Sequence, residues 1–261
     1  MFTLGVSVSI PRKAVIRQNW FDQGGEAYAR FRPGYPPELA QYLASVSAGR
    51  TLAVDVGCGS GQLAVHLARH FDRVLGVDPS ADQITHATAH PRVDYVYATA
   101  EALPVARHGA GLIVAAQAAH WFDLPRFYQE VRRIGQPGAA LALVSYGVLK
   151  LDDALDVRFS RFYHDEIGPY WPAERALVDT GYAGLPFPFD ERTPPRLQIR
   201  LAWCLDDLLG YIATWSAVRR LREAARDDVL QGFAADLAAL WGDPSHRRAV
   251  HWPINMRLGR L

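Results

Sequence analysis

The sequence predicts an α/β fold whose centre is a mostly parallel β-sheet with helices on both faces. Short apolar runs alternate with amphipathic stretches between residues 51 and 146. A glycine-rich turn, "GCGSGQ", follows the first run, and the second run, "RVLGVD", ends on an aspartate. Strands that alternate with helices in this way indicate a parallel sheet covered on both sides.

Five strands are expected in the first part of the chain, because their sequences are rich in valine, leucine and alanine. They are "TLAVDV" (51–56), "RVLGVD" (73–78), "VDYVYATA" (93–100), "GLIVAAQ" (111–117) and "AALALVSY" (139–146). Between the first two, apolar residues at helical spacing predict a helix over 63–71. A second apolar face, formed by Phe127, Val131 and Ile134, predicts a helix before the fifth strand.

The pattern changes after residue 146. Residues 150 to 200 are rich in aromatic residues and proline, which indicates a small cap inserted after the fifth strand. "RLQIRLAWCL" and "RAVHWPINMRLGRL" predict two further strands, with helices between them. We therefore expect a Rossmann-like sheet of seven strands. We divide the chain into an N-terminal arm with helices covering the active site (1–50), a cofactor-binding core (51–147), the cap (148–200) and a segment that completes the sheet (201–261).

Composition narrows the class of protein. The 261 residues carry a formal charge of +1 and no run of five like charges, which argues against a nucleic-acid partner. We find no apolar window long enough to cross a membrane and no secretory signal. Cys58 and Cys204 form no CxxC pattern, so we expect no metal site and a reducing, cytoplasmic compartment. Arginine far outnumbers lysine, as in GC-rich bacteria, and the protein is expected to be a monomer or a homodimer.

The glycine turn is the first candidate for a binding site. Gly57, Gly59 and Gly61 allow positive φ and leave no Cβ in the way of a ligand. In an open parallel sheet, a turn after the first strand lies where a nucleotide-like cofactor binds. The dinucleotide fingerprint is G-x-G-x-x-G, and here the third glycine comes one place too early.

Two aspartates accompany the turn. Asp78, at the end of the second strand, is placed to accept both hydroxyl groups of a ribose. It could instead cap the next helix, but Ser80 and Gln83 form an S-x-x-Q capping pattern that suits that task better. Asp55 lies inside the first strand, where it serves either the cofactor or the glycine turn as a hydrogen-bond acceptor.

The motifs "VDVGCGSGQ", "VLGVDPS", "ATAEALP" and "AAQAAHWFD" together resemble the cofactor motifs of class I S-adenosylmethionine-dependent methyltransferases. "YARFRPGYP", "YWPAER" and "TWSAV" extend the resemblance to the branch of trans-aconitate methyltransferase, over about residues 20 to 261. The resemblance implies S-adenosylmethionine as cofactor. The family usually has aspartate where this chain has Gly111.

The resemblance also implies roles for individual residues. The cofactor would be held by Asp55, Gly57, Gly59, Gly61, Asp78, Pro79, Thr99, Ala100, Glu101 and Gln117. The substrate would be bound by Tyr28, Arg32 and Tyr35 of the arm, by Trp121, and by Tyr170, Trp171 and Trp215 of the cap. The cap aromatics could equally form the core of that segment.

His120 is the candidate catalytic residue. It follows the fourth strand, and an imidazole of ordinary pKa can accept a proton at neutral pH. It could also shape the pocket wall or donate a hydrogen bond to a substrate carboxylate. Arg175 could bind an anionic substrate or form a surface ion pair.

We therefore expect a methyltransferase acting on a small molecule, most simply by O-methylation of a carboxylate or hydroxyl. N- or C-methylation of a natural-product intermediate is the alternative. A nicotinamide-dependent oxidoreductase and a catalytically silent cofactor-binding protein are more remote, because the glycine spacing argues against the first and the intact turn and Asp78 argue against the second.

Overall fold

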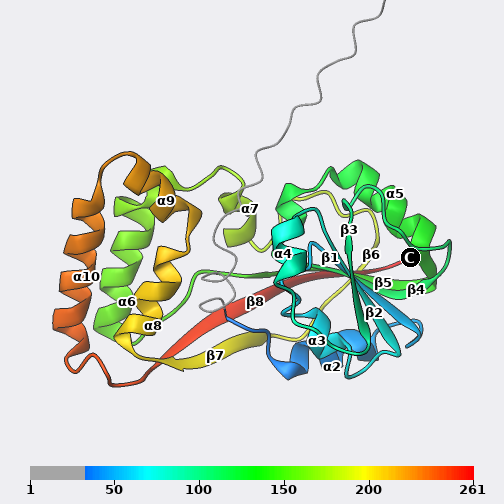
Figure 1. Ribbon diagram of the computed structural model, residues 1–261, viewed down its shortest axis with the longest axis horizontal. Coiled ribbons are helices and arrows are strands. Elements are labelled where there is room, and N and C mark those ends of the chain that lie inside the picture. Colours follow the sequence, from blue (N-terminus) through cyan, green and yellow to red (C-terminus); the bar gives the residue numbers. More distant parts are fainter. Residues whose placement is uncertain (1–32) are drawn as a thin grey trace, which may run out of the picture.

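The computed structural model describes residues 33–261. Within them the chain forms an α/β fold around one mixed β-sheet of eight strands (Figure 1). The strands are β1 (Leu52–Val56), β2 (Arg73–Asp78), β3 (Val93–Tyr97), β4 (Ala110–Ala116), β5 (Gly135–Tyr146), β6 (Asp190–Arg192), β7 (Leu197–Trp203) and β8 (Arg248–Arg260). Their order is β3-β2-β1-β4-β5-β8-β6, and β7 also pairs with β8. β1 to β5 are parallel, whereas β8 runs antiparallel to β5, β6 and β7. The expected α/β fold is confirmed, with one short strand, β6, in addition.

Both faces of the sheet are buried, as the continuous apolar strands predict. Along β4, Leu112 and Val114 face one core, whereas Ile113 and Ala115 face the other. The first core is covered by α2 (Pro37–Ser45) and α3 (Ala64–Leu67), and the second by α5 (Leu124–Ile134). α4 (Ala81–Thr85) follows β2. The strand order reverses between β1 and β4, which is where ligands bind in open α/β sheets.

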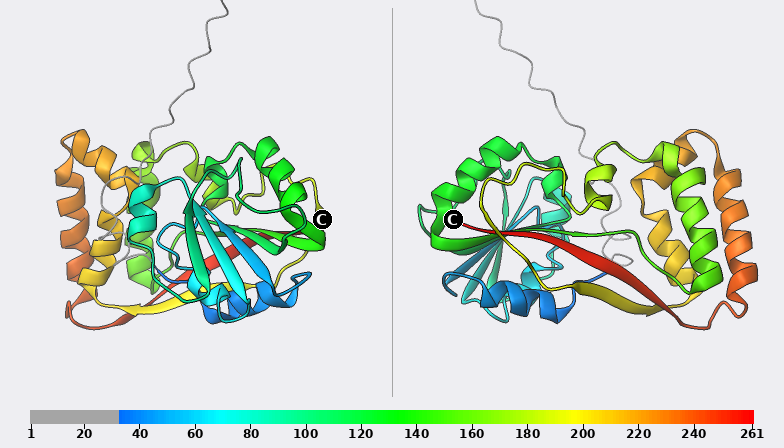
Figure 2. Two further views of the ribbon diagram at one scale, coloured as in Figure 1. Left: turned by 45° about the vertical axis from the view of Figure 1, so that its right-hand side comes forward. Right: turned by 180° about the vertical axis from the view of Figure 1, so that it is seen from behind.

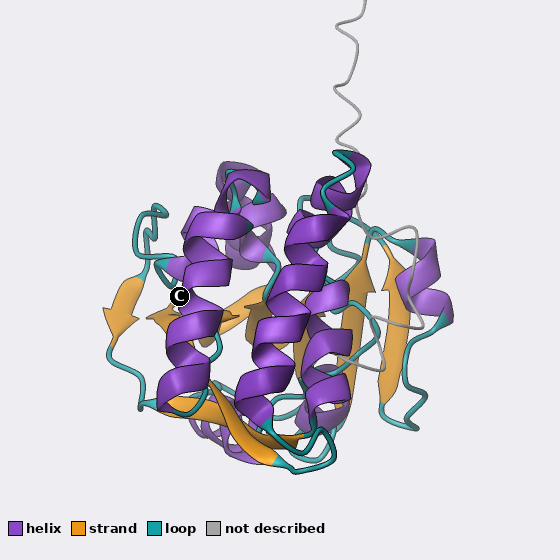
Figure 3. Cartoon of the chain, turned by 90° about the vertical axis from the view of Figure 1, so that its left-hand side faces the viewer, coloured by secondary structure: helices purple, strands orange, loops and turns teal. Residues whose placement is uncertain are grey.

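The remaining helices form a lobe beside the sheet (Figure 3). They are α6 (Asp153–Arg161), η2 (Phe162–Glu166), η3 (Gly168–Tyr170), α8 (Leu205–Ala213), α9 (Ser216–Glu223) and α10 (Asp227–Trp241), while α7 (Arg175–Asp179) lies between this lobe and the sheet (Figure 1). Phe162 and Phe233 stack in the lobe with ring centroids 3.9 Å apart. The lobe therefore combines helices from both segments that the sequence analysis divides at residue 200.

β8 joins the lobe to the sheet. Its C-terminal half pairs with β5, and its N-terminal half pairs with β7 over Arg248 to Ile254. Figure 2 shows this strand running from the helical lobe into the sheet, where it lies between β5 and β6. Because one strand belongs to both parts, the lobe is held at a fixed position near the carboxyl ends of the parallel strands.

Two local features differ from what the sequence and the family resemblance lead one to expect. The helix expected over 63–71 is α-helical only at Ala64–Leu67, and turns complete the segment to Phe71. Gly111 lies in β4, where a Cβ would come 2.4 Å from the carbonyl oxygen of Gly49, so an aspartate does not fit there.

Among the described helices, none is long and apolar enough to cross a membrane.

Candidate active site

The turn after β1 has the conformation that its glycines predict. Gly57, Gly59 and Gly61 have φ values of +70°, +56° and +86°. Gly57 also packs against the loop after β4, because a Cβ on it would lie 2.4 Å from the Cβ of Ala118. The turn is thereby pressed against the switch point of the sheet, with its backbone close to any ligand bound there.

Asp78 is buried at the end of β2 and holds the glycine turn. Its Oδ2 accepts a hydrogen bond from the Gly59 amide at 2.8 Å, and its Oδ1 accepts one from the Ser80 amide at 2.9 Å. Burial raises its pKa, while these two backbone donors act to lower it. Each oxygen keeps a lone pair for a further donor, as a ribose would require.

Ser80 forms one of the two hydrogen bonds expected of a capping pattern with Gln83. Ser80 is the N-cap of α4, and its Oγ accepts from the Gln83 amide at 3.3 Å. The Ser80 amide donates to Asp78 instead of to the Gln83 side chain. Asp78 therefore supports the start of α4 and the glycine turn together.

Asp55 is fully enclosed in β1, with 1% of its surface exposed. Neither carboxylate oxygen forms a hydrogen bond within the described part of the chain. Desolvation, followed by the charge of Asp78, raises its pKa to about 7, although the Ala64 amide acts to lower it. The acceptor that holds the glycine turn is thus Asp78, and Asp55 is left as a buried carboxyl group beside the site.

The segment after β3 carries the residues expected near an adenine. Ala100 is buried in the core beneath α5, Thr99 is exposed and Glu101 is half-buried. Glu101 Oε1 accepts from the Asp123 amide at 2.9 Å, which ties this segment to the start of α5. Pro79 is exposed directly after Asp78.

Gln117 follows β4 with a φ of +55°, a left-handed conformation that is unusual for a residue with a Cβ. The backbone N–H of Gln117 donates to the Val144 carbonyl at 2.8 Å, and its side-chain Nε2 donates to the Tyr146 carbonyl at 3.5 Å. Its Oε1 is buried without a hydrogen-bond partner among the described residues. A strained residue with an unsatisfied buried acceptor, at the switch point of the sheet, suits a cationic amino group of a ligand.

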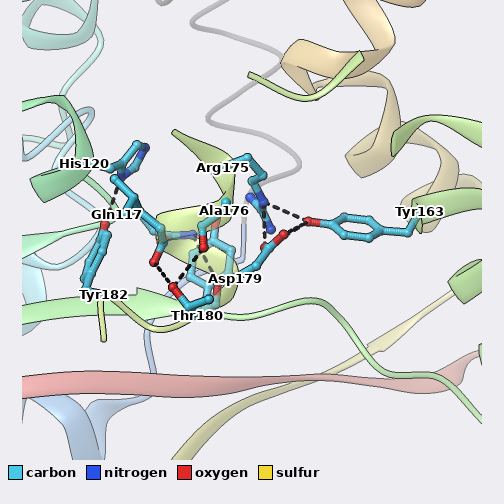
Figure 4. Close-up of polar contacts among 10 residues, drawn as sticks. Gln117, His120, Tyr163, Arg175, Ala176, Asp179, Thr180 and Tyr182 are labelled. Atoms are coloured by element: carbon cyan, nitrogen blue, oxygen red, sulfur yellow. Dashed lines mark hydrogen bonds and ion pairs between the residues drawn. The ribbon is translucent and has the colours of Figure 1, made fainter. Parts of the chain in front are cut away.

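His120 lies in the short helix η1 (Ala119–Trp121) that follows Gln117. Its Nδ1 is 2.9 Å from the hydroxyl oxygen of Tyr182, and the two rings stack at 6.0 Å (Figure 4). Burial, followed by the charge of Arg175, lowers the pKa of His120 to about 3. The imidazole is therefore neutral at pH 7.

Arg175, on α7, is held between the lobe and the sheet with 17% of its side chain exposed. Its Nε donates to the Tyr163 hydroxyl at 2.8 Å and to Asp179 Oδ1 at 2.9 Å, while the Tyr163 hydroxyl lies 3.0 Å from both Asp179 oxygens (Figure 4). Its guanidinium carbon lies 4.9 Å from the ring centre of Trp171. Arg175 does form an ion pair, but in an enclosed aromatic setting and not on the open surface.

The cap aromatics divide into two groups. Trp171 and Trp215 lie 5.3 Å apart and both contact the ring of Tyr163, and of these two tryptophans Trp171 packs on Arg175. Tyr170 packs towards α9, where its carbonyl accepts from Arg220 at 3.5 Å.

The other expected substrate residues come from η1 and the arm. Trp121 packs on His120 at 4.8 Å, and Tyr35 packs on Tyr146 at 6.2 Å, at the end of β5. Tyr28 and Arg32 lie outside the described residues.

Comparison with known proteins identifies the family. The sequence model of the family described as "Methyltransferase domain" matches residues 54–143 of this chain. A methyltransferase-family protein of Dictyostelium discoideum is 35% identical over 248 residues, which cover 92% of this chain and 94% of that protein. The chain belongs to the methyltransferase family. A type II methyltransferase structure from Anaeromyxobacter dehalogenans is 45% identical, with a TM-score of 0.84, and covers 88% of this chain and 98% of that one.

This methyltransferase is a class I, S-adenosylmethionine-dependent enzyme, as the sequence motifs predict. The observed site fits that cofactor, because Asp78 has acceptor capacity for the ribose and Gln117 Oε1 is an unsatisfied acceptor for the amino group. A malonyl-[acyl-carrier protein] O-methyltransferase of Hahella chejuensis is also similar, at 34% identity over 110 residues, or 39% of each chain. The trans-aconitate branch remains a prediction.

Sequence reasoning did not identify Tyr182 or the partners of Arg175. Tyr182 has a φ of +64° and follows Gly181, whose φ is +63°. The "TGY" sequence after a helical stretch is a signal for such a turn, since glycine commonly ends helices in this conformation. The contact with His120 spans 62 positions and has no local signal.

Proposed function

We propose that this methyltransferase transfers a methyl group to an oxygen of a small molecule, and that the acceptor is a carboxylate. The observation that carries the proposal is the guanidinium group of Arg175. Its Nε is committed to Asp179 and Tyr163, whereas its two terminal nitrogens form no hydrogen bond with the described residues. A guanidinium end of this kind binds a carboxylate through two parallel hydrogen bonds.

The surroundings of Arg175 favour an acid with an apolar part. Trp171 and Tyr163 pack on the guanidinium and Trp215 packs on both of these rings, which together form an aromatic wall. The indole N–H of Trp171 is buried without a partner within the described part of the chain. Charges attract more strongly in such a low-dielectric setting than in water. Apolar and aromatic side chains with a few convergent polar groups are typical of small-molecule binding sites.

For methyl transfer to a carboxylate, the protein mainly has to bind the two reactants and align them. When bound, the cofactor supplies a methyl group on a positively charged sulfur that is already electrophilic. The glycine turn and Asp78 would hold the nucleoside part, and Gln117 the amino acid part. A carboxylate is ionised at neutral pH, so no proton has to be removed before it attacks. Arg175 would orient it, while the aromatic wall excludes water.

Other acceptors are less well supported by this arrangement. A hydroxyl acceptor would need a base, and the Nδ1 atom of His120 is already engaged with Tyr182. The Hahella relative is named as an O-methyltransferase, which favours oxygen, although its similarity covers 39% of this chain. N- or C-methylation remains the alternative function.

The test is a screen of small acids against matched alcohols, phenols and amines, with methyl-labelled S-adenosylmethionine as donor. We expect labelled products from acids that carry an apolar group. Alkaline hydrolysis should release the label as methanol, because methyl esters are saponified and methyl ethers are not. A base-stable product would overturn the assignment of a carboxylate acceptor.

The variant Arg175→Gln tests the proposed binding group. Without the charge, kcat/KM for the acid should fall about a hundredfold, since a charged hydrogen-bonded contact contributes up to about 3 kcal/mol. The affinity for S-adenosylhomocysteine should stay the same. Arg161→Gln is the matched control, because Arg161 is 72% exposed on α6 of the lobe. Equal activity of both variants would contradict the role of Arg175.

A further inference from the structure

The contact between His120 and Tyr182 determines which nitrogen of the imidazole faces the substrate. Tyr182 is fully buried, and burial raises its pKa, so the phenol keeps its proton. Within the described part of the chain, the one hydrogen bond of this hydroxyl is the 2.9 Å contact with Nδ1 of His120. A phenol oxygen has two lone pairs and one O–H. A buried O–H without an acceptor is costly, and Nδ1 is the acceptor in contact with it, so the O–H donates to Nδ1 of His120.

A neutral imidazole carries one N–H, and an Nδ1 that accepts a hydrogen bond cannot hold it. The proton must then be on Nε2, which forms no hydrogen bond with the described residues and is not an enclosed, unsatisfied atom. An imidazole in this form cannot take a proton at Nε2. It can donate a hydrogen bond to an oxygen atom.

We propose that Tyr182 is a positioning residue which fixes His120 as a hydrogen-bond donor, so that His120 Nε2 and Arg175 together recognise an anionic oxygen group of the substrate. This inference rests on the proposed function and defines the part that His120 has in it. Arg175 and Tyr182 both come from the segment 175–182, which therefore supplies the anion-binding charge and the partner of His120 (Figure 4). His120 is then a specificity residue and not a general base.

The decisive measurement is the tautomer of His120 in the wild-type protein, by nitrogen NMR after labelling of histidine. His120→Gln identifies the His120 resonances by their loss. We expect the Nε2–H form at pH 7, with no substrate needed. The Nδ1–H form or the imidazolium would overturn the proposal.

Two variants separate positioning from a merely structural effect. In Tyr182→Phe, the Nε2–H signature should give way to a mixture of tautomers. Tyr163→Phe is the matched control, because its hydroxyl contacts Arg175 and Asp179 but not His120, and it should leave the His120 signature unchanged. An unchanged tautomer in folded Tyr182→Phe would contradict the proposal.

Kinetics on an acid found by the screen give a second readout. His120→Gln keeps a side-chain N–H donor and should raise KM less than threefold, whereas His120→Ala should raise it about tenfold with unchanged affinity for S-adenosylhomocysteine. Equal loss of kcat in both variants would indicate a base and overturn the proposal. If the tautomer is as expected but no acid is methylated, the proposed function fails and the assignment of the donor stands.

Discussion

Asp55 and Asp78 lie near the carboxyl ends of neighbouring parallel strands, yet their surroundings differ. Asp78 accepts two backbone hydrogen bonds, whereas neither oxygen of Asp55 forms one within the described residues. A buried carboxylate without hydrogen bonds is costly and takes up a proton more readily. Asp78 is therefore suited to accept hydrogen bonds from a ligand, whereas Asp55 takes up a proton more readily.

Asp78→Ala should weaken S-adenosylhomocysteine binding at least tenfold. The variant loses the acceptors for the ribose hydroxyls and also the hydrogen bond that holds the Gly59 amide. Isothermal titration calorimetry measures the change directly. Asp94→Ala, at an exposed ion pair on β3, is the control and should bind as the wild type does. Equal affinity of the Asp78 variant would exclude the ribose role.

Asp55→Asn should stabilise the protein more at pH 8 than at pH 5. The folded-state pKa of about 7 lies above the ordinary value of 3.8, so the stability contributed by protonated Asp55 is full below about pH 4. It is lost as the pH rises through about 7, at a cost on the order of 4 kcal/mol. Urea denaturation at both pH values tests this. A pH-independent difference between variant and wild type would contradict the high pKa.

Local patterns point to the glycine turn and Asp78 more directly than to the contacts that His120 and Arg175 form. Gly57, Gly59 and Asp78 were predicted because the turn and the strand end lie within 25 positions of each other. The contacts of His120 with Tyr182 and of Arg175 with Tyr163 depend on how the lobe packs against the sheet. No spacing of residues in the sequence predicts that arrangement.

At the scale of elements, the strands of the sheet follow directly from their apolar runs, and β1 to β5 lie within a few residues of the predicted ranges. The helical lobe was less predictable. α6 and α10 are separated by about 70 positions, and the ion pair of Arg158 with Asp236 that joins them has no local signature. The sequence could indicate helices there, but not that helices from both segments would share one core.

The glycine turn supports a prediction that separates strain from steric overlap. Gly61→Ala should lower the melting temperature more than Gly138→Ala. Both glycines have positive φ, +86° and +76°, so both changes carry the cost of about 1 kcal/mol for a left-handed alanine. Only at Gly61 would the new Cβ lie 2.0 Å from the Tyr95 hydroxyl, while nothing lies within 4 Å at Gly138. Thermal denaturation of both variants checks this, and equal shifts would contradict it.

At the scale of the whole molecule, the lobe and the sheet share a core. One continuous cluster of buried residues runs from Leu67 and Val114 at the sheet to Phe162 and Leu237 in the lobe. Parts that share a core and a strand are expected to unfold together. The lobe is therefore a part of the domain and not an independent unit.

This predicts a single unfolding transition. Most of the described tryptophans, including Trp171, Trp215 and Trp241, lie in or beside the lobe, so tryptophan fluorescence reports on that part. Far-ultraviolet circular dichroism reports on both parts. Urea curves from the two probes should have the same midpoint. Separate midpoints would show that the lobe unfolds on its own.

The pairing of β8 with three other strands also determines what the growing chain exposes during synthesis. β5, β6 and β7 are all made before β8, the strand with which each of them pairs. Until residues 248–260 leave the ribosome, these strands present unpaired edges, which are the surfaces by which chains aggregate. Slow or interrupted translation between β7 and β8 should therefore lower the yield of correctly folded protein more than the same delay ahead of β5, when none of these edges has been made.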